Sequence, residues 1–228
     1  MGRSAADEKI LSYNDVVLRQ SDLDILSGPF FLNDRIIEFY FSHLSSVLPL
    51  EDVLLVSPAI AFWITNCPDL GSLKDFLEPL KLPNRSLVMF PVNNNDDVSL
   101  PEGGSHWSLV VYWRNQKVFV HHDSYGATNE RYARQLYKAV VGFLGTSDTG
   151  PETTYMEFTD SPQQVNGYDC GIYVTAIAKA ICHWHETCDH KEADDMWFSD
   201  VKEKINPYTV ADMRVEILWL IKGFMENK

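Results

Sequence analysis

The sequence predicts an α+β domain in which a small, mainly antiparallel sheet is flanked by helices. Apolar residues recur at helical spacing towards both ends of the chain, and three strand-like apolar runs lie between them. The last two runs are separated by only three residues, as in an antiparallel hairpin. Because 45% of the 228 residues are hydrophobic and no repeat or linker interrupts them, we expect one domain over residues 1–228, with a flexible tail at residues 1–10.

The first two predicted helices precede the sheet. Asn33 is a candidate N-cap, because its side chain can accept a hydrogen bond from the first turn of a helix. A wide apolar face follows at helical spacing, formed by Ile36, Ile37, Phe39, Tyr40, Leu44 and Val47. A second helix is predicted to begin at Ser57 and Pro58, since proline is favoured at the first position of a helix.

The three predicted strands cover residues 86–92, 106–113 and 117–124. Their apolar runs are nearly continuous rather than alternating, which is typical of strands that are covered on both faces. The last two strands are expected to pair as a hairpin.

Helices and one more strand are predicted in the second half of the chain. Residues 128–144 have apolar residues at helical spacing, and residues 153–160 are typical of a strand. An apolar run that begins at Cys170 predicts a buried helix. The final helix is expected to open at Thr209, with Asp212 in the third helical position of a capping box.

The charge of the chain narrows the classes of partner. It has 19 Lys and Arg against 32 Asp and Glu residues, a formal net charge of −13. This argues against nucleic acid, since phosphate binding needs a basic surface, whereas an acidic surface suits a basic protein. No apolar run reaches the roughly 18 residues of a membrane span. Four cysteines without a recognisable signal peptide are expected to be free thiols, so we expect an intracellular protein, in the cytoplasm, the nucleus or both.

Cys170 is a candidate nucleophile because of where it stands. It lies at a predicted loop-to-helix junction, directly before Gly171. Unpaired backbone N–H groups and a partial positive charge at a helix N-terminus favour a thiolate, the nucleophilic form of cysteine. Position alone does not exclude a buried structural cysteine.

Three other residues strengthen the catalytic interpretation. His106 opens one strand of the predicted hairpin and Asp123 ends the other, so the pairing makes them neighbours. A carboxylate behind an imidazole fixes its tautomer and stabilises its charged form. Gln164, in the loop that leads to Cys170, could supply a side-chain amide to an oxyanion.

The motifs around these residues are highly specific in combination. His106 is followed by Trp107, residues 120–124 read VHHDS, and residues 162–171 read PQQVNGYDCG. This pattern resembles the ubiquitin-like-protein-specific cysteine proteases, which have an adenain-type, papain-related α+β core and cleave SUMO or neddylation-type modifiers after a C-terminal Gly-Gly. The resemblance covers most of the chain, is closest to the small deneddylases, and includes residues 11–13, 18–22, 31–34, 76–80 and 103–109.

The resemblance implies a reaction that needs no cofactor and no metal. Cys170 would be the nucleophile and His106 its base, with Asp123 orienting the imidazole. Gln164 would stabilise the oxyanion. The implied partners are a modifier of the neddylation (RUB) type and its protein conjugates, and we expect the protein to act as a monomer without nucleic acid or membrane.

The resemblance also implies residues that bind the Gly-Gly tail of the modifier. Such a tail has no side chains, so its selection requires a narrow passage, and Trp107 and Phe31 fall where the family places aromatic walls. Relatives usually carry tryptophan at the Phe31 position, and phenylalanine lacks the indole N–H. Asp34 could contact the tail or stabilise a helix start. Residues 93–104 correspond to a loop that orders over the bound modifier.

Alternative functions lie within and outside this class. A SUMO protease would keep the chemistry and change the modifier, and a non-catalytic reader would bind the modifier without cutting it. Residues 182–190 are also dense in potential metal ligands, with Cys182, His185 and Cys188 or Asp189 able to share a helix face. Their spacing matches no zinc pattern, so packed helix residues are the preferred interpretation. His121 and His122 are likewise expected to be strand neighbours rather than ligands.

Overall fold

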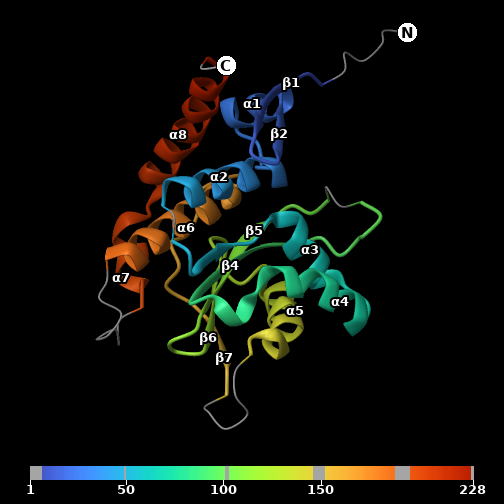
Figure 1. The fold of residues 1–228 in the computed structure, drawn as a ribbon. Helices are drawn as coiled ribbons and strands as arrows, with labels where there is room; N and C mark the ends of the chain where they lie inside the picture. Colours follow the sequence, from blue (N-terminus) through green and yellow to red (C-terminus); the bar gives the residue numbers. More distant parts are fainter. Residues whose placement is uncertain (1–6, 49, 101–102, 146–151, 188–195, 227–228) are drawn as a thin grey trace.

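A mixed sheet between two helical layers forms the centre of the molecule (Figure 1). The computed structural model describes residues 7–48, 50–100, 103–145, 152–187 and 196–226. None of the helices described there has the length and hydropathy needed to cross a membrane.

The five strands of the sheet lie in the order β3-β4-β5-β6-β7. They are β3 (Val53–Leu55), β4 (Leu87–Asn93), β5 (Trp107–Trp113), β6 (Val118–His122) and β7 (Thr154–Glu157). The predicted β5–β6 hairpin is confirmed, and β4 pairs antiparallel with β5. The two short edge strands, β3 and β7, run parallel to their neighbours, so the sheet is mixed at its edges.

Both faces of the sheet are buried, as the continuous apolar runs predicted. Alternate residues such as Met89 and Val111 pack against α2 (Asp34–Val47) and α6 (Cys170–Thr187). Their neighbours on the strands, such as Phe90 and Tyr112, pack on the other face, towards the third and fifth helices. Figure 1 shows α2 and α6 on one side of the sheet and α3 (Pro58–Asn66) and α5 (Glu130–Val140) on the other.

The remaining elements lie around this sandwich. The helices are α1 (Gln20–Ser27), α4 (Leu70–Leu77), α7 (Phe198–Lys204) and α8 (Pro207–Glu226), with 3-10 turns at Glu78–Leu80, Leu82–Asn84 and Val141–Phe143. A separate antiparallel pair, β1 (Lys9–Tyr13) and β2 (Val16–Arg19), lies beside α8 near the N-terminus (Figure 1). The expected tail over residues 1–10 was therefore too long, because β1 begins at Lys9; residues 1–6 lie outside the described residues.

The helix starts predicted at Asn33, Pro58 and Cys170 are confirmed, and the start predicted at Thr209 is wrong. The Asn33 side chain accepts a hydrogen bond from the backbone N–H of Ile36, at 3.1 Å, and so caps α2. The last helix begins at Pro207 rather than at Thr209. Asn206 supplies the cap, because its Oδ1 accepts the N–H groups of Tyr208 and Thr209. Proline at the first helical position needs no N–H partner, which allows this earlier start.

Candidate active site

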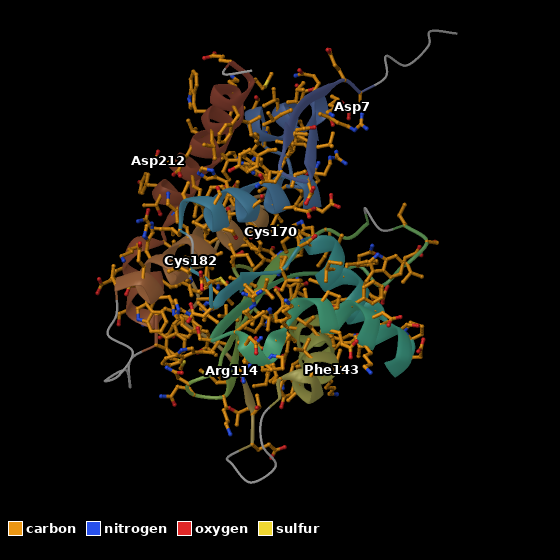
Figure 2. The ribbon with its side chains drawn as sticks, viewed as in Figure 1. Asp7, Arg114, Phe143, Cys170, Cys182 and Asp212 are labelled. Carbon is orange, nitrogen blue, oxygen red and sulfur yellow. The ribbon has the colours of Figure 1, made fainter. Side chains whose placement is uncertain are left out.

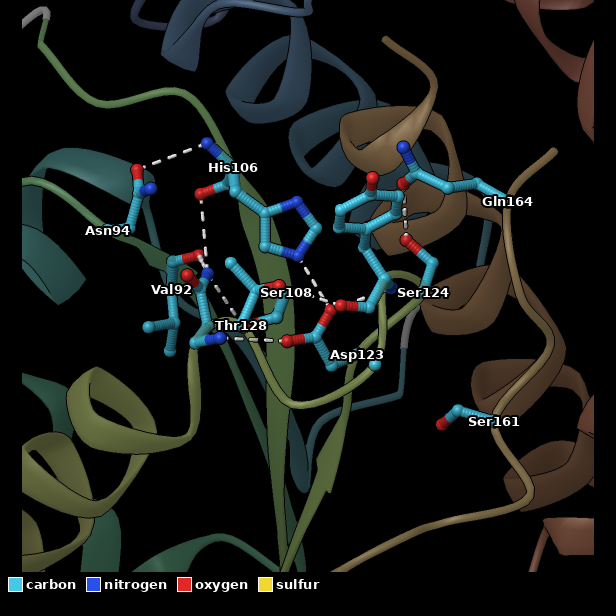
Figure 3. A network of polar contacts seen from close by, with 12 residues as sticks. Val92, Asn94, His106, Ser108, Asp123, Ser124, Thr128, Ser161 and Gln164 are labelled. Atoms are coloured by element: carbon cyan, nitrogen blue, oxygen red, sulfur yellow. Dashed lines mark hydrogen bonds and ion pairs between the residues drawn. The ribbon is translucent and has the colours of Figure 1, made fainter. Parts of the chain in front are cut away.

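The hairpin brings His106 and Asp123 together. His106 directly precedes β5 and Asp123 directly follows β6, and these two strands pair with Leu109 opposite His122. The His106 Nε2 atom lies 2.6 Å from Asp123 Oδ1, and both side chains are buried (Figure 3). The pairing predicted from the sequence therefore exists as a short, buried hydrogen bond.

Backbone N–H groups hold the Asp123 carboxylate in place. Its Oδ1 accepts the N–H of Tyr125 and its Oδ2 accepts the N–H of Asn129, each at 2.9 Å. Burial raises the pKa of Asp123, but the His106 hydrogen bond and these N–H groups outweigh it, so the pKa is lowered. The carboxylate is therefore charged at neutral pH and can stabilise a positive imidazolium.

Cys170 lies on the other side of the imidazole. It is the first residue of α6, is fully buried, and sits between the helical layer and the sheet (Figure 2). Burial lowers the pKa of His106, but hydrogen bonds to Asp123 and to the Cys170 thiol raise it to a net value of about 9. Since Nε2 is taken by Asp123, Nδ1 is the nitrogen that remains for the thiol. A positively charged imidazolium beside the sulfur is the setting in which a cysteine acts as a nucleophile.

Gln164 is fixed in the loop before the nucleophile. Its backbone N–H donates to Ser124 O at 2.8 Å, and its Oε1 accepts the Ser124 hydroxyl at 2.9 Å (Figure 3). Its Nε2 donates to Asn166 O at 2.7 Å. An amide nitrogen carries two protons, so one N–H bond of Gln164 holds the side chain and a second can serve a substrate oxygen.

A pocket of about 370 Å³ adjoins His106 through its neighbour Trp107. The indole of Trp107 is 9% exposed and donates to Leu32 O at 2.9 Å, whereas Phe31 is 48% exposed. Asp34 lines the same pocket, and Asn33, not Asp34, supplies the side-chain cap of α2. The three predicted substrate residues are therefore brought together around one pocket, whose other lining residues include Asn33, Arg35, Phe62, Trp63, Gly103 and Gly104.

The loop before His106 is tied to the active site. The Asn94 side chain accepts the N–H of Ser105 at 2.7 Å. It also accepts the N–H of His106 at 3.1 Å (Figure 3). Gly104 has φ +84°, and a Cβ on it would lie 1.8 Å from the Asn93 side chain, so only glycine fits. Residues 101 and 102 of this loop lie outside the described residues.

Asn129 is a site residue that the sequence analysis missed. It is fully buried, and its Nδ2 donates to Val92 O and to the Ser108 hydroxyl, at 3.0 and 3.1 Å, with His106 O at 3.3 Å. Its side chain therefore holds the backbone of His106, and its backbone N–H holds the carboxylate of Asp123. No sequence signal marks it, because an asparagine before a helix usually indicates a cap.

The two histidines beside Asp123 have structural partners. His121 lies between Glu157 and Ser108, at 2.6 and 2.8 Å. The Nε2 of His122 accepts the indole N–H of Trp197 at 2.9 Å, and burial, followed by the neighbouring His121, lowers the pKa of His122 to about 3. They are strand neighbours, as expected.

The zinc alternative gains no support from the described residues. Burial raises the pKa of Cys182 to about 12, and His185 lies 3.2 Å from Asp52. Cys188 and Asp189, the other candidate ligands, fall outside the described residues. Within the part of the chain that is described, no three potential ligands gather in one place.

A thiol that is hydrogen-bonded to an imidazole, with a buried carboxylate behind the imidazole, is the arrangement of cysteine peptidases. Here it stands at the junction of a buried helix and an antiparallel hairpin of an α+β fold. The fold and the site together define this class.

Comparison with known proteins places the chain within a particular family. A model described as "Ulp1 protease family, C-terminal catalytic domain" matches residues 31–206. The protein therefore belongs to the Ulp1 protease family, and it is a cysteine peptidase.

Two relatives and one solved structure show how far the similarity extends. "NEDD8-specific protease 1" of Arabidopsis thaliana is 52% identical over 227 residues, which cover 100% of this chain and 98% of that protein. "Sentrin-specific protease 8" of Homo sapiens is 36% identical over 179 residues, covering 77% and 82%. The C-terminal Ulp1 protease domain in complex with Smt3, the yeast ortholog of SUMO, has the same fold, with a TM-score of 0.68 at 19% identity, covering 97% of this chain and 90% of that chain.

Proposed function

We propose that this protein is a deneddylase, which cleaves after the C-terminal Gly-Gly of a NEDD8-type modifier. The observation that carries the proposal is the Cys170–His106–Asp123 arrangement, in a chain that is 52% identical over its whole length to a NEDD8-specific protease. Its substrates are modifier precursors, proteins that carry the modifier on a lysine, or both.

The proposed reaction begins with the Cys170 thiolate, which attacks the carbonyl carbon of the last glycine. The bond to the leaving amine breaks as the protonated His106 donates its proton to that amine, and a thioester remains. A water molecule then gives a proton to neutral His106 and attacks the thioester, which releases the modifier with a free C-terminal carboxyl group and restores the Cys170 thiolate beside protonated His106. Asp123 holds the imidazole in position and stabilises its charged form in both steps.

The tetrahedral oxyanion needs hydrogen-bond donors. Cys170 is the first residue of α6, and the first N–H groups of a helix have no partner within it. We assign the Cys170 N–H and the second amide N–H of Gln164 as donors, supported by the fixed position of the Gln164 side chain.

The pocket beside Trp107 is assigned to the tail of the modifier. Its aromatic lining, Phe31 and Trp107, suits a Gly-Gly segment, because glycine has no side chain for which the pocket must make room. Phe31 supplies a flat apolar wall, and Asp34 adds a carboxylate to the lining. We also propose a location in the cytoplasm or the nucleus, which the three described cysteines support because all are free thiols.

The first test is cleavage of C-terminal fluorogenic conjugates of NEDD8, ubiquitin and SUMO by the wild-type protein and by Cys170→Ala. We expect strong preference for NEDD8, and no cleavage by the variant, although it should still bind NEDD8 because its recognition surface is untouched. Preference for SUMO would overturn the proposed substrate while keeping the chemistry. Cleavage of none of the three conjugates, with binding retained, would instead support a non-catalytic reader.

A further inference from the structure

Arg214 joins three segments that are distant in the sequence. It lies on α8, beyond residue 206, where the match to the family model ends. Its Nη1 donates to Ile25 O and Gly28 O, at 3.1 and 3.2 Å, and its Nη2 donates to Phe30 O at 3.0 Å. Its Nε and Nη2 also donate to Asp169 Oδ1, at 3.1 and 2.8 Å. A single guanidinium thus connects α8, the α1–α2 connection and the residue before Cys170.

This contact is shielded from water. The side chains of Arg214 and Asp169 are each 11% exposed, and the guanidinium lies 5.5 Å from the centre of the Tyr168 ring. Charge-assisted hydrogen bonds in such surroundings are stronger than at an exposed surface. The planar guanidinium presents its five N–H donors in fixed directions, which a lysine ammonium cannot reproduce.

On one side, the contact reaches the proposed oxyanion donor. Asp169 Oδ2 accepts an N–H from Asn166 Nδ2 at 2.6 Å, and Asn166 O accepts the Nε2 of Gln164 at 2.7 Å. A continuous chain of hydrogen bonds therefore runs from Arg214 through Asp169 and Asn166 to Gln164. Asp169 is also bonded covalently to Cys170.

On the other side, the contact reaches the wall of the tail pocket. Phe30 O, which Arg214 binds, is followed by Phe31 and Leu32, and both line the pocket. Leu32 O accepts the indole N–H of Trp107. Residues 30–32 therefore link Arg214 to Trp107, the other aromatic residue of the pocket.

We propose that Arg214 is a positioning residue that sets the distance between segment 30–32 and the loop that carries Gln164 and leads into Cys170 at the start of α6. The modifier tail must fit between these two parts while its last carbonyl meets Cys170. The inference rests on the proposed function for its substrate, but the contact itself is independent of that assignment.

The test compares Arg214→Ala and Arg214→Lys with Lys222→Ala. The control removes a positive charge from the same helix, where Lys222 lies over the Trp219 ring. For NEDD8 conjugates, we expect Arg214→Ala to lower kcat/KM by at least about tenfold, through both kcat and KM, since a displacement of about 1 Å can cost about 100-fold. Arg214→Lys should fall between wild type and alanine. The rate at which iodoacetamide alkylates Cys170 in the Arg214 variants should stay within about twofold of the wild-type rate, because His106 is unchanged.

Amide hydrogen exchange tests the contact without relying on turnover. Residues 28–32 and 164–170 should both lose protection in Arg214→Ala, and neither should in Lys222→Ala. Unchanged protection in either segment would overturn the positioning role of Arg214, even if wild type cleaves NEDD8 conjugates. A folded Arg214→Ala with wild-type kcat and KM, full rescue by lysine, or an equal kinetic loss in Lys222→Ala would overturn it too. Inactivity of the wild type towards every conjugate would instead count against the proposed function.

Discussion

Each charged group of the active site is buried together with groups that compensate its charge. Asp123 has His106 and two backbone N–H groups, and His106 has Asp123 and the Cys170 thiol. An uncompensated charge in this position would be strongly destabilising. Catalytic preorganisation and local stability therefore depend on the same contacts.

The pKa of His106 predicts how the contribution of this residue to the stability of the fold varies with pH. The folded protein raises the pKa from 6.5 to about 9, so it binds the proton more tightly than the unfolded chain. The resulting stabilisation is complete below pH 6.5 and is lost as the pH rises to about 9. We expect the difference in unfolding free energy between wild type and His106→Gln, from urea titrations, to shrink over this window. A difference that grows with pH would contradict the assignment.

Gln164 should affect turnover more than substrate binding. Loss of one oxyanion donor typically lowers kcat by about 100- to 1000-fold, because the donor acts mainly in the transition state. We expect Gln164→Ala to show this loss with a nearly unchanged KM. Gln20→Ala, at the exposed start of α1, is the control. If Gln164→Ala retained full kcat, the oxyanion assignment would be wrong.

At the scale of elements, the start of α6 is set by its contact with the segment before α2. A Cβ on Gly171 would lie 2.7 Å from Leu32 Cβ, so the helix and the segment approach each other too closely for any side chain at this position. Leu32 also binds Trp107 through its carbonyl. Gly171 therefore allows the nucleophile and one wall of the pocket to lie side by side.

Gly171→Ala should consequently damage both folding and turnover. Leu32 Cβ is next to the backbone and cannot rotate away, so the segment must shift, at a cost of about 1–3 kcal/mol in unfolding free energy. We expect urea unfolding to show this loss and cleavage assays to show reduced kcat/KM. Gly142→Ala is the matched control, since a Cβ there meets nothing within 4 Å. Equal stability of the two variants would refute the close-contact argument.

At the scale of the whole molecule, the sheet connects two apolar cores. The core on the α6 side includes Trp113, Trp184 and Trp197, whose rings meet edge to face. Trp197 donates its indole N–H to His122 on β6, which anchors the segment before α7 to the sheet. This anchor requires a neutral imidazole, since a protonated ring offers no acceptor.

His122 should therefore make the fold sensitive to acid. Burial lowers its pKa to about 3, so its stabilisation is present above pH 6.5 and is lost as the pH falls from 6.5 towards 3. His122→Gln, which keeps an acceptor for the indole, should be less stable at neutral pH and should lose less stability on acidification. His183→Gln, at an exposed site on α6, should behave like wild type. Identical acid slopes for wild type and His122→Gln would contradict this prediction.

Several features of the fold could be predicted because they depend on local pattern. The β5–β6 hairpin follows from two apolar runs with a short connection, and it brings His106 and Asp123 to the same end of the sheet. The cap at Asn33 is likewise local. The strand predicted over residues 153–160 is confirmed as β7. The short strands β1, β2 and β3 were not predicted, because three to five residues carry little periodicity.

The sequence by itself determined the class of chemistry, the order of the catalytic candidates and the buried hairpin, since each is encoded in neighbouring residues. Only the tertiary structure decided which distant groups hold these residues in place. Asn129 and Arg214 bind mainly backbone carbonyl groups, which are present at every position of the chain. They also bind the carboxylates of Asp123 and Asp169, respectively. Such contacts leave no pattern in the sequence, because they arise only when separate segments pack together.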